Sequence, residues 1–268
     1  MSGFTAEWLS LREPYDMAAR NSKVLGAVIA SLKSRPLHVV DLACGSGSTV
    51  RALHTKLPTP QLWDLVDNDP GLLALACNQD LGRDVTLNAI PLDLSRDFKA
   101  ALGSKISLIT ISALLDLVSE TWLHQFARAV IARAIPVYAA LTYDGVIDLS
   151  PVDSFDTAIV SSVNMHQRTN KGFGPALGLS AASTAIASFE ALGYSVVSGA
   201  SDWVAGPNDR AIQNELLEGW ANAARNLGTI PSADIARWLQ LRAAVVSAGR
   251  STMRVGHVDF FAFPSSMR

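Results

Sequence analysis

An acidic side chain, Asp41, stands two residues before a turn of small residues, Ala43-Cys44-Gly45-Ser46-Gly47. The apolar residues within 37–42 predict a short buried strand before the turn, and residues 48–53 read as the start of a helix. Glycine lets a ligand approach the backbone closely, and the first turn of a helix offers free N–H groups. This order is typical of a nucleotide-binding site; the alternative is a turn that only ends a strand.

The spacing of the glycines indicates which class of nucleotide such a turn can bind. A dinucleotide-binding turn has a third glycine three residues after Gly47, and Val50 stands there instead. A Walker loop for phosphate needs Gly-Lys-Ser or Gly-Lys-Thr after its spacer, and no such triplet follows. The spacing therefore argues against a dinucleotide and against a nucleoside triphosphate.

The pattern acid-leucine-small-x-Gly-x-Gly, which runs from Asp41 to Gly47, resembles the first motif of class I S-adenosylmethionine (SAM)-dependent methyltransferases. That family usually has glycine at the position of Ala43. By this resemblance, Asp41, Ala43 and the backbone of Gly45 and Gly47 hold the methionine part of SAM.

The resemblance covers residues 37–145 well, and residues 180–203 and 254–263 loosely. It implies an α/β fold with a doubly wound, mostly parallel seven-stranded sheet of the Rossmann-like methyltransferase type. We expect a single methyltransferase domain over residues 1–268. The implied cofactor is SAM, with S-adenosylhomocysteine as its product.

A second acidic position follows the strand predicted at 62–66. Asp67 comes about 20 residues after the glycine turn, where a carboxylate can accept hydrogen bonds from both hydroxyls of a ribose. Asn68 is assigned to the same cofactor site. Asp69 is interpreted as the cap of the following helix.

A third acidic position follows the strand predicted at 85–92. The resemblance places Asp93 at the amino group of adenine and the backbone of its neighbour, Leu94, at the adenine ring. Asp97 competes for this role, and an ordinary turn aspartate is the alternative without function.

The fourth and fifth strands, predicted at 106–111 and 136–141, end at the edge where open α/β sheets bind ligands. We therefore expect the residues after them to border the methyl group and its acceptor. Ser112 is assigned to the cofactor. Asp116 either binds the substrate or caps the helix predicted at 121–132.

A long polar stretch, residues 146–179, is predicted to form an ordered cap with a helix at 157–165. Within it, Arg168 and Lys171 are expected to pair with an anionic group of the substrate, so that Lys171→Ala raises the substrate KM. If the acceptor is a hydroxyl, His166 is a candidate for the base that removes its proton.

Tyr143 and Asp144, directly after the fifth strand, are equal candidates for this catalytic role. The remaining histidines are interpreted as structural because they lie inside predicted strands or helices: His38, His54, His124 and His257. No His-x-His or Glu-x-x-His pattern accompanies the aspartates, so the sequence predicts no metal site.

Additional helices are predicted outside the sheet. Residues 4–34 read as an N-terminal helical lid broken at Pro14, with an ordinary solvated face as the alternative. An insertion at 205–250 contains two amphipathic helices, 208–227 and 232–247, which pack as structure, form a homodimer surface or make one wall of the substrate pocket. Five polar residues cluster near the break in the lid: Arg12, Glu13, Tyr15, Asp16 and Arg20.

The composition narrows the class of protein. The net charge is −2 and the basic residues are scattered, which argues against nucleic acid as a partner. The two cysteines, Cys44 and Cys77, are too few for a disulfide framework. No signal-peptide pattern is present, and the apolar stretch 106–118 is too short to span a membrane. We expect a cytoplasmic protein without a membrane partner.

Together these patterns predict SAM-dependent methyl transfer to oxygen or nitrogen of a small molecule. One alternative is a different transfer from a SAM-type cofactor, such as aminopropyl transfer, whose enzymes usually have an Asp pair where only Asp116 stands. A second is a SAM-binding subunit that regulates or supports a partner without catalysis. A NAD-dependent dehydrogenase is disfavoured by Val50.

Overall fold

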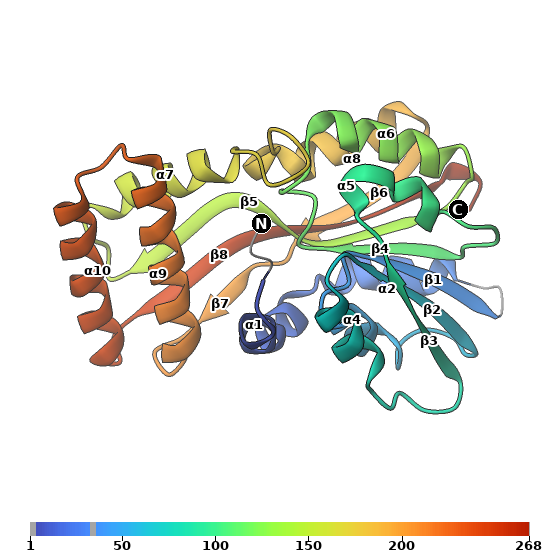
Figure 1. The fold of residues 1–268 in the computed structure, drawn as a ribbon, viewed down its shortest axis with the longest axis horizontal. Helices are drawn as coiled ribbons and strands as arrows, with labels where there is room; N and C mark the ends of the chain where they lie inside the picture. Colours follow the sequence, from blue (N-terminus) through green and yellow to red (C-terminus); the bar gives the residue numbers. More distant parts are fainter. Residues whose placement is uncertain (1–3, 33–35, 268) are drawn as a thin grey trace.

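A single mixed sheet organises the chain in the computed structural model, which describes residues 4–32 and 36–267. Its strands follow the order β3-β2-β1-β4-β5-β8-β6, and β7 pairs with β8 beside this path (Figure 1). The strands are β1 (Leu37–Leu42), β2 (Gln61–Asp67), β3 (Val85–Pro91), β4 (Leu108–Ser112), β5 (Val137–Ser150), β6 (Tyr194–Ala200), β7 (Trp203–Ala205) and β8 (Thr252–Pro264).

Two helices precede the first strand, and the other helices lie between strands along the chain. They are α1 (Ala6–Ala19), α2 (Ser22–Ser31), α3 (Ser48–Leu53), α4 (Pro70–Cys77), α5 (Leu94–Asp97), α6 (Glu120–Ile131), α7 (Asp156–Gln167), α8 (Ala181–Ala191), α9 (Arg210–Leu227) and α10 (Ser232–Ser247). The 3-10 turns are η1 (Phe98–Ala101), η2 (Gly178–Ser180) and η3 (Ser265–Met267).

The predicted fold class is confirmed. The first five strands pair in parallel, and β8 enters antiparallel between β5 and β6. The seven predicted strands are all present, and β7 is a short eighth strand that the sequence did not predict. The parallel strands end at one edge, and this edge is where the glycine turn lies.

Each face of the sheet has its own hydrophobic core. Val24 of α2 and Val50 of α3 belong to the core of one face, and Phe126 of α6 and Phe189 of α8 belong to the core of the other. Figure 1 shows α5, α6 and α8 on one side of the strands and α1, α2 and α4 on the opposite side. The central strands are mostly apolar because both faces are covered, and the buried Asp41 of β1 and Asp259 of β8 are exceptions.

The fifth strand differs from its predicted end at residue 141 and continues to Ser150. Within this extension Ile147 and Leu149 are buried while Asp148 and Ser150 are exposed. This alternation with period two is a strand signal, so the first five residues of the predicted cap, 146–150, are strand and not loop. Here β5 pairs with Thr252–Val255, which lie before the predicted start of the last strand.

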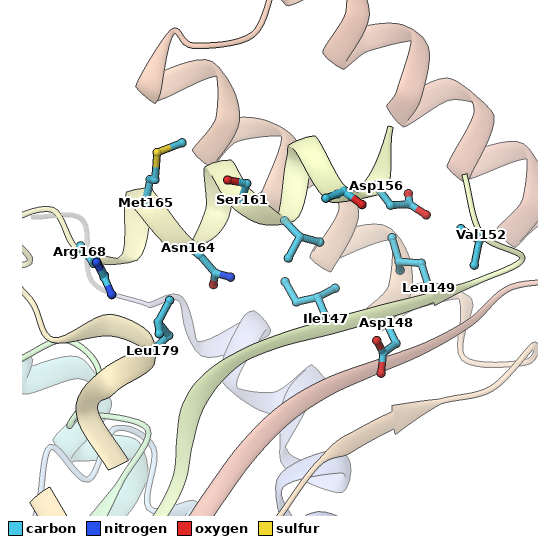
Figure 2. A pocket seen from close by; sticks show the side chains of 12 residues that line it. Ile147, Asp148, Leu149, Val152, Asp156, Ser161, Asn164, Met165, Arg168 and Leu179 are labelled. Carbon is cyan, nitrogen blue, oxygen red and sulfur yellow. The ribbon is translucent and has the colours of Figure 1, made fainter. Parts of the chain in front are cut away.

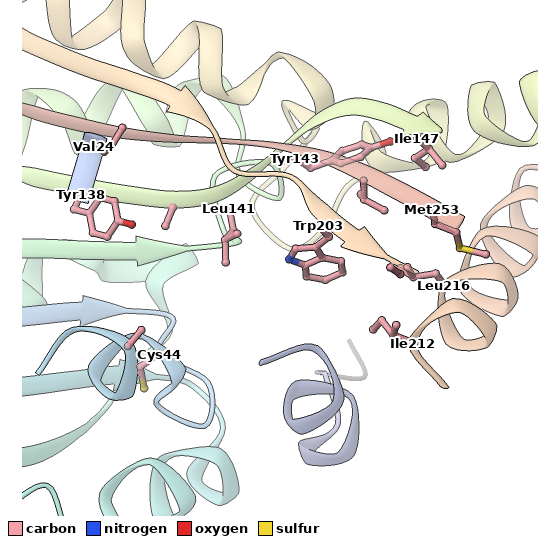
Figure 3. Packing of buried hydrophobic residues seen from close by; sticks show 14 of the residues in the cluster. Val24, Cys44, Tyr138, Leu141, Tyr143, Ile147, Trp203, Ile212, Leu216 and Met253 are labelled. Carbon is pink, nitrogen blue, oxygen red and sulfur yellow. The ribbon is translucent and has the colours of Figure 1, made fainter. Parts of the chain in front are cut away.

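The extended β5–β8 ribbon, together with β7, carries α7, α9 and α10 (Figure 1). We call these elements the added lobe. Its core is continuous with one face of the sheet, since the cluster runs from Tyr138 past Tyr143 and Trp203 to Leu216 and Met253 (Figure 3).

The predicted N-terminal lid consists of two helices, α1 and α2, and the break between them is not at Pro14 as predicted. Pro14 lies inside α1, and the chain bends at Arg20, after which Asn21 caps α2 by accepting a hydrogen bond from Val24 N. Residues 33 and 34 of the predicted lid lie outside the described residues. The break falls after Arg20 because the Asn21 side chain starts a new helix there.

Candidate functional site

The turn after β1 has a left-handed backbone at three positions: φ is 55° at Ala43, 52° at Gly45 and 85° at Gly47. Glycine adopts this conformation freely, whereas alanine is strained by its Cβ. A Cβ on Gly45 would lie 3.2 Å from Leu9 Cδ1 of α1. The turn therefore needs its glycines, and α1 packs directly over it.

The structure brings Asp67 to this turn. Asp67 Oδ2 accepts a hydrogen bond from Gly45 N at 2.9 Å, and its Oδ1 accepts one from Asp69 N at 3.0 Å. Asp69 caps α4 by accepting bonds from Gly71 N and Leu72 N, while Asn68 is exposed. The carboxylate of Asp67 thus joins the ends of the first two strands at the glycine turn.

Asp41 and Arg20 are two ionisable residues whose side chains have buried polar atoms and lie near each other beside the turn. Asp41 Oδ1 accepts a hydrogen bond from Thr110 Oγ1 at 2.7 Å, whereas its Oδ2 has no partner among the described residues. Burial raises the pKa of Asp41 to about 7, against the opposing effect of the nearby Arg20. Arg20 Nη1 donates to Tyr138 Oη at 3.4 Å, but its buried Nε and Nη2 have no partner within residues 4–32 and 36–267.

The other residues assigned to the cofactor follow β3 and β4. Asp93 caps α5, with Oδ1 accepting bonds from Ser95 N at 3.0 Å and Ser95 Oγ at 2.6 Å, and these bonds lower its pKa. Leu94 is buried, and its carbonyl accepts a bond from Trp122 Nε1 at 2.8 Å. Ser112 is the last residue of β4. These positions remain a prediction.

Helix α1 is fastened to the sheet by polar contacts. Asp16 Oδ2 accepts a bond from Arg12 Nε at 3.0 Å, and Asp16 Oδ1 accepts one from Trp203 Nε1 at 3.0 Å. Tyr15 Oη donates to Asp209 Oδ1 at 2.8 Å. The helix therefore bridges the glycine turn and the added lobe, with a charged face turned inward.

Asp116 does not cap the helix after β4. Ser119 is the N-cap of α6 and accepts a bond from Trp122 N, which excludes this alternative. Asp116 is 6% exposed and its Oδ1 has no partner among the described residues. Burial raises the pKa of Asp116 to about 6, against the effects of Arg12 and Lys171.

The two catalytic candidates after residue 141 point to different neighbours. Tyr143 Oη donates to Asn164 Oδ1 of α7 at 2.7 Å, and burial raises the pKa of Tyr143. Asp144 accepts a bond from Val146 N at 2.9 Å and lies against Gly256 of β8.

The candidates from the cap lie at the end of α7. His166 Nδ1 and Lys171 Nζ are 3.2 Å apart. Burial and the charge of Lys171 lower the pKa of His166, and burial lowers the pKa of Lys171 against the attraction of Asp116. The structure therefore groups Asp116 with His166 and Lys171, whereas Arg168 is exposed further along.

A cleft of about 650 Å³ lies in the added lobe, between α7 and the extension of β5 (Figure 2). Its apolar lining includes Ile147 and Leu149 of β5, Asn164 of α7 faces them, and Arg168 stands at one end. Arg168 lines this cleft, whereas Lys171, which follows the same helix, lies beside His166.

Sequence reasoning missed the individual roles of several buried polar residues. Arg12, Asp16 and Arg20 were placed in the lid without contacts, and His257 was interpreted as structural. His257 is 6% exposed, and its Nδ1 has no partner among the described residues. A charged residue every three or four positions along α1 was the available signal, since such residues share one face.

The described part of the chain contains neither a candidate metal-binding cluster nor a candidate membrane-spanning helix. Within it, no group of three or more His, Cys, Asp and Glu side chains is placed to hold a metal ion. None of its helices combines the length and the apolar character needed to cross a bilayer.

Solved structures share this arrangement of strands and helices. The chain is similar to a cyclopropane-fatty-acyl-phospholipid synthase-like protein from Lactobacillus casei, with 13% identity, a TM-score of 0.51 and coverage of 97% of this chain and 95% of that one. It is also similar to a cyclopropane synthase from Mycobacterium tuberculosis, with 9% identity, a TM-score of 0.50 and coverage of 97% and 93%. The chain has their fold.

A third similar structure is a SAM-dependent methyltransferase from Geobacter sulfurreducens in complex with S-adenosyl-L-homocysteine, with 15% identity, a TM-score of 0.45 and coverage of 98% and 100%. No protein-family model matches the chain, and no curated protein matches it in sequence. The strand order and the first two likenesses establish the class I methyltransferase fold. A fold alone leaves the reaction to be argued from the site.

Proposed function

We propose that the chain is a SAM-dependent methyltransferase that acts on a small molecule at oxygen or nitrogen. The observation that carries the proposal is the placement of Arg20 and Asp41 beside the glycine turn. Asp41 is fully buried and Arg20 partly so, and each has buried side-chain atoms without a partner among the described residues. Unpaired buried polar atoms destabilise a fold, so a pair of opposite sign at a ligand-binding edge favours a ligand that pairs with both.

The amino-acid end of SAM has the matching chemistry. Its carboxylate can accept hydrogen bonds from Arg20 Nε and Nη2, and its ammonium group can donate to Asp41 Oδ2. Asp67 would accept bonds from the ribose hydroxyls with its remaining lone pairs, and Asp93 and Leu94 would hold the adenine. The residues present fit the group, which when bound supplies an electrophilic methyl group on a sulfonium.

The chain's own part in the reaction would be positioning and exclusion of water. Holding two reactants in line can lower a barrier by about 7–11 kcal/mol in favourable cases. Helix α1 covers the glycine turn through Leu9, which supports its predicted role as a lid. Asp116 and Lys171, from the loops after β4 and α7, would contact the substrate, with Arg168 further out.

The proton of the acceptor needs a destination if the acceptor is a hydroxyl. His166, with its lowered pKa, is neutral at pH 7 and can accept a proton, although its Nδ1 lies beside Lys171. Tyr143 keeps its proton at pH 7 because its pKa is raised, so as a neutral phenol it would orient the substrate. Asp144 is the third candidate.

The cellular compartment and the partners are proposed from the cysteine chemistry and the composition. Cys44 is a free, buried thiol whose pKa is raised by burial, which suits a reducing compartment and a packing role. We therefore propose a cytoplasmic enzyme with small molecules as partners, and not nucleic acid or a membrane. The exposed sides of α9 and α10 would supply the surface of a homodimer if one forms.

The test is calorimetric titration of the protein with SAM, S-adenosylhomocysteine and NAD. Wild type is compared with Asp67→Ala and Arg20→Leu, and with Asp80→Ala as a control, because the exposed Asp80 accepts a bond from Gly82 N within its own loop. We expect adenosylhomocysteine to bind wild type and the control alike. In the other two variants its affinity should fall at least about tenfold, as expected for loss of a charge-assisted hydrogen bond.

The outcomes separate the candidate functions. Heat with NAD and none with adenosylhomocysteine would overturn the proposal. Binding of adenosylhomocysteine without methyl transfer to any of a broad set of hydroxyls and amines would favour a non-catalytic SAM-binding subunit.

A further inference from the structure

Asp116 and His257 share an unusual state in the part of the chain that the structure describes. Each is 6% exposed, and each has a buried side-chain atom, Asp116 Oδ1 or His257 Nδ1, that makes no hydrogen bond there. Asp116 comes from the loop after β4, and His257 lies in the middle of β8. Buried polar atoms are nearly always paired, so two orphaned ones with neighbours in common indicate a ligand.

The two side chains face the same neighbours. The charge of Arg12 acts on the pKa of Asp116 and on that of His257, in each case after the effect of burial. Tyr143 links them as well: its ring centroid lies 6.2 Å from that of His257 across the β5–β8 pair, and the charge of Asp116 helps to raise its pKa. The ring of Trp203 lies 5.0 Å from His257.

His257 presents a hydrogen-bond acceptor. Burial first, and then the charge of Arg12, lower its pKa to about 4, so the imidazole is neutral at pH 7. A hydrogen bond to the backbone of Val255 opposes this shift. A neutral imidazole carries one hydrogen, so in the tautomer protonated at Nε2 the unpartnered Nδ1 is an acceptor. Asp116 Oδ1 is an acceptor too.

The cluster adjoins the glycine turn through α1. Leu9 lies over Gly45, and Arg12 is three residues further along α1, which places both on one face of the helix. On this one face, Leu9 therefore lies over the glycine turn, and Arg12 is the residue whose charge acts on Asp116 and His257.

We propose that Asp116 and His257 bind the methyl acceptor, a planar molecule that presents a hydroxyl or amine hydrogen to them and lies against the rings of Tyr143 and Trp203. This inference rests on the proposed function and names the substrate class of that site. Two acceptor atoms require donors on the ligand, and the flanking rings suit an aromatic body. Methyl transfer removes one of the hydroxyl or amine hydrogens that these atoms accept, which would weaken binding of the product and favour its release.

The experiment uses pairs of probes that differ by one methyl group on the donor atom: phenol with anisole, catechol with guaiacol, and N-methylaniline with N,N-dimethylaniline. Each is titrated into protein labelled at its histidine side chains, with and without S-adenosylhomocysteine, and followed by NMR. Wild type is compared with His257→Phe and Asp116→Ala. His124→Asn is the matched control, because His124 is an exposed histidine of α6 whose ion-pair distance to Glu120 is 3.9 Å.

We expect at least one donor probe to shift the His257 resonances and its methylated partner to bind about tenfold more weakly, the effect of one lost hydrogen bond. Both site variants should weaken the donor probe by a similar factor, and the control should not. If His257→Phe does not fold, Asp116→Ala and the wild-type titration decide.

Three results would overturn the inference: equal affinity for both members of every pair, unchanged affinity in the site variants, or no probe that reaches His257. These outcomes are distinct from failure of the proposed function, which shows as absent binding of adenosylhomocysteine. Binding of the donor probes without adenosylhomocysteine binding would leave a small-molecule site in a chain of another function.

Discussion

Glu13 of α1 and Arg51 of α3 form a two-pronged ion pair. Arg51 Nε and Nη2 donate to Glu13 Oε1 and Oε2, each at 2.5 Å, and Arg51 Nη1 donates to the carbonyl of Ser46 at 2.7 Å. One guanidinium thus joins the N-terminal helix to the glycine turn itself. This contact gives the lid a specific fastening at the proposed cofactor site.

Replacement of this carboxylate should loosen the lid. In Glu13→Gln we expect S-adenosylhomocysteine to dissociate roughly three to ten times faster, because a partly exposed bidentate pair contributes on the order of 1 kcal/mol. Stopped-flow displacement measures the rate. Glu7→Gln, on the same helix but exposed, is the control; equal rates in wild type and Glu13→Gln would show that the ion pair does not hold the lid.

Ala43 offers a test of the turn's backbone. Its φ of 55° strains an alanine, so Ala43→Gly should raise the free energy of unfolding by about 0.5–1 kcal/mol, and urea unfolding measures the change. Ala129→Gly, inside α6, should lower it by about 1 kcal/mol because its backbone is helical. Destabilisation in both variants would contradict the strain at Ala43.

Much of the fold was readable from local patterns. The glycine turn, the ends of β2 and β3 and the amphipathic pair α9 and α10 follow from periodicity and turn residues. The end of β5 could not be read in this way. Bulges near Leu141 and Gly145 interrupt the alternation of buried and exposed residues before it resumes at Ile147.

The site was less readable because its contacts join distant segments. Asp16 meets Trp203, and Arg20 meets Tyr138, only after the sheet has formed. Whether a buried side chain lacks a partner depends on all of its neighbours, so nothing local to His257 in the sequence distinguishes it from a structural histidine.

The raised pKa of Asp41 predicts a pH dependence of stability. The folded pKa of about 7 exceeds the ordinary value of 3.8, so folding favours the protonated acid. Stability is therefore highest below about pH 4 with respect to this group and falls as the pH rises toward 7. At about 1.4 kcal/mol per pKa unit, the loss is on the order of 4 kcal/mol.

The measurement is urea unfolding of wild type and Asp41→Asn between pH 4 and pH 8. The difference between them should grow in favour of the variant as the pH rises through this window, because Asn carries no charge to bury. Saturating S-adenosylhomocysteine should shrink the difference by pairing its ammonium group with the carboxylate. A difference independent of pH would show that Asp41 is ionised throughout.

A buried ion pair fixes the added lobe. Arg242 of α10 donates through Nε to Asp156 Oδ1 at 2.9 Å, through Nη2 to Oδ2, and through Nη1 to the carbonyl of Pro151 at 2.6 Å. Trp238 Nε1 donates to the same Oδ1 at 2.9 Å. Removal of one partner leaves a buried charge unpaired, so Arg242→Ala should lower the free energy of unfolding by about 3–5 kcal/mol.

Two comparisons test this explanation. The double variant Arg242→Leu with Asp156→Leu should lose less stability than Arg242→Ala, because it leaves no orphaned charge. Arg254→Ala, which removes exposed pairs with Asp148 and Asp202 on the same lobe, should change stability little. If the double variant is as unstable as the single one, packing and not charge accounts for the loss. Binding of S-adenosylhomocysteine should persist in the folded fraction of all three, since Asp156 and Arg242 contact the lobe and not the glycine turn.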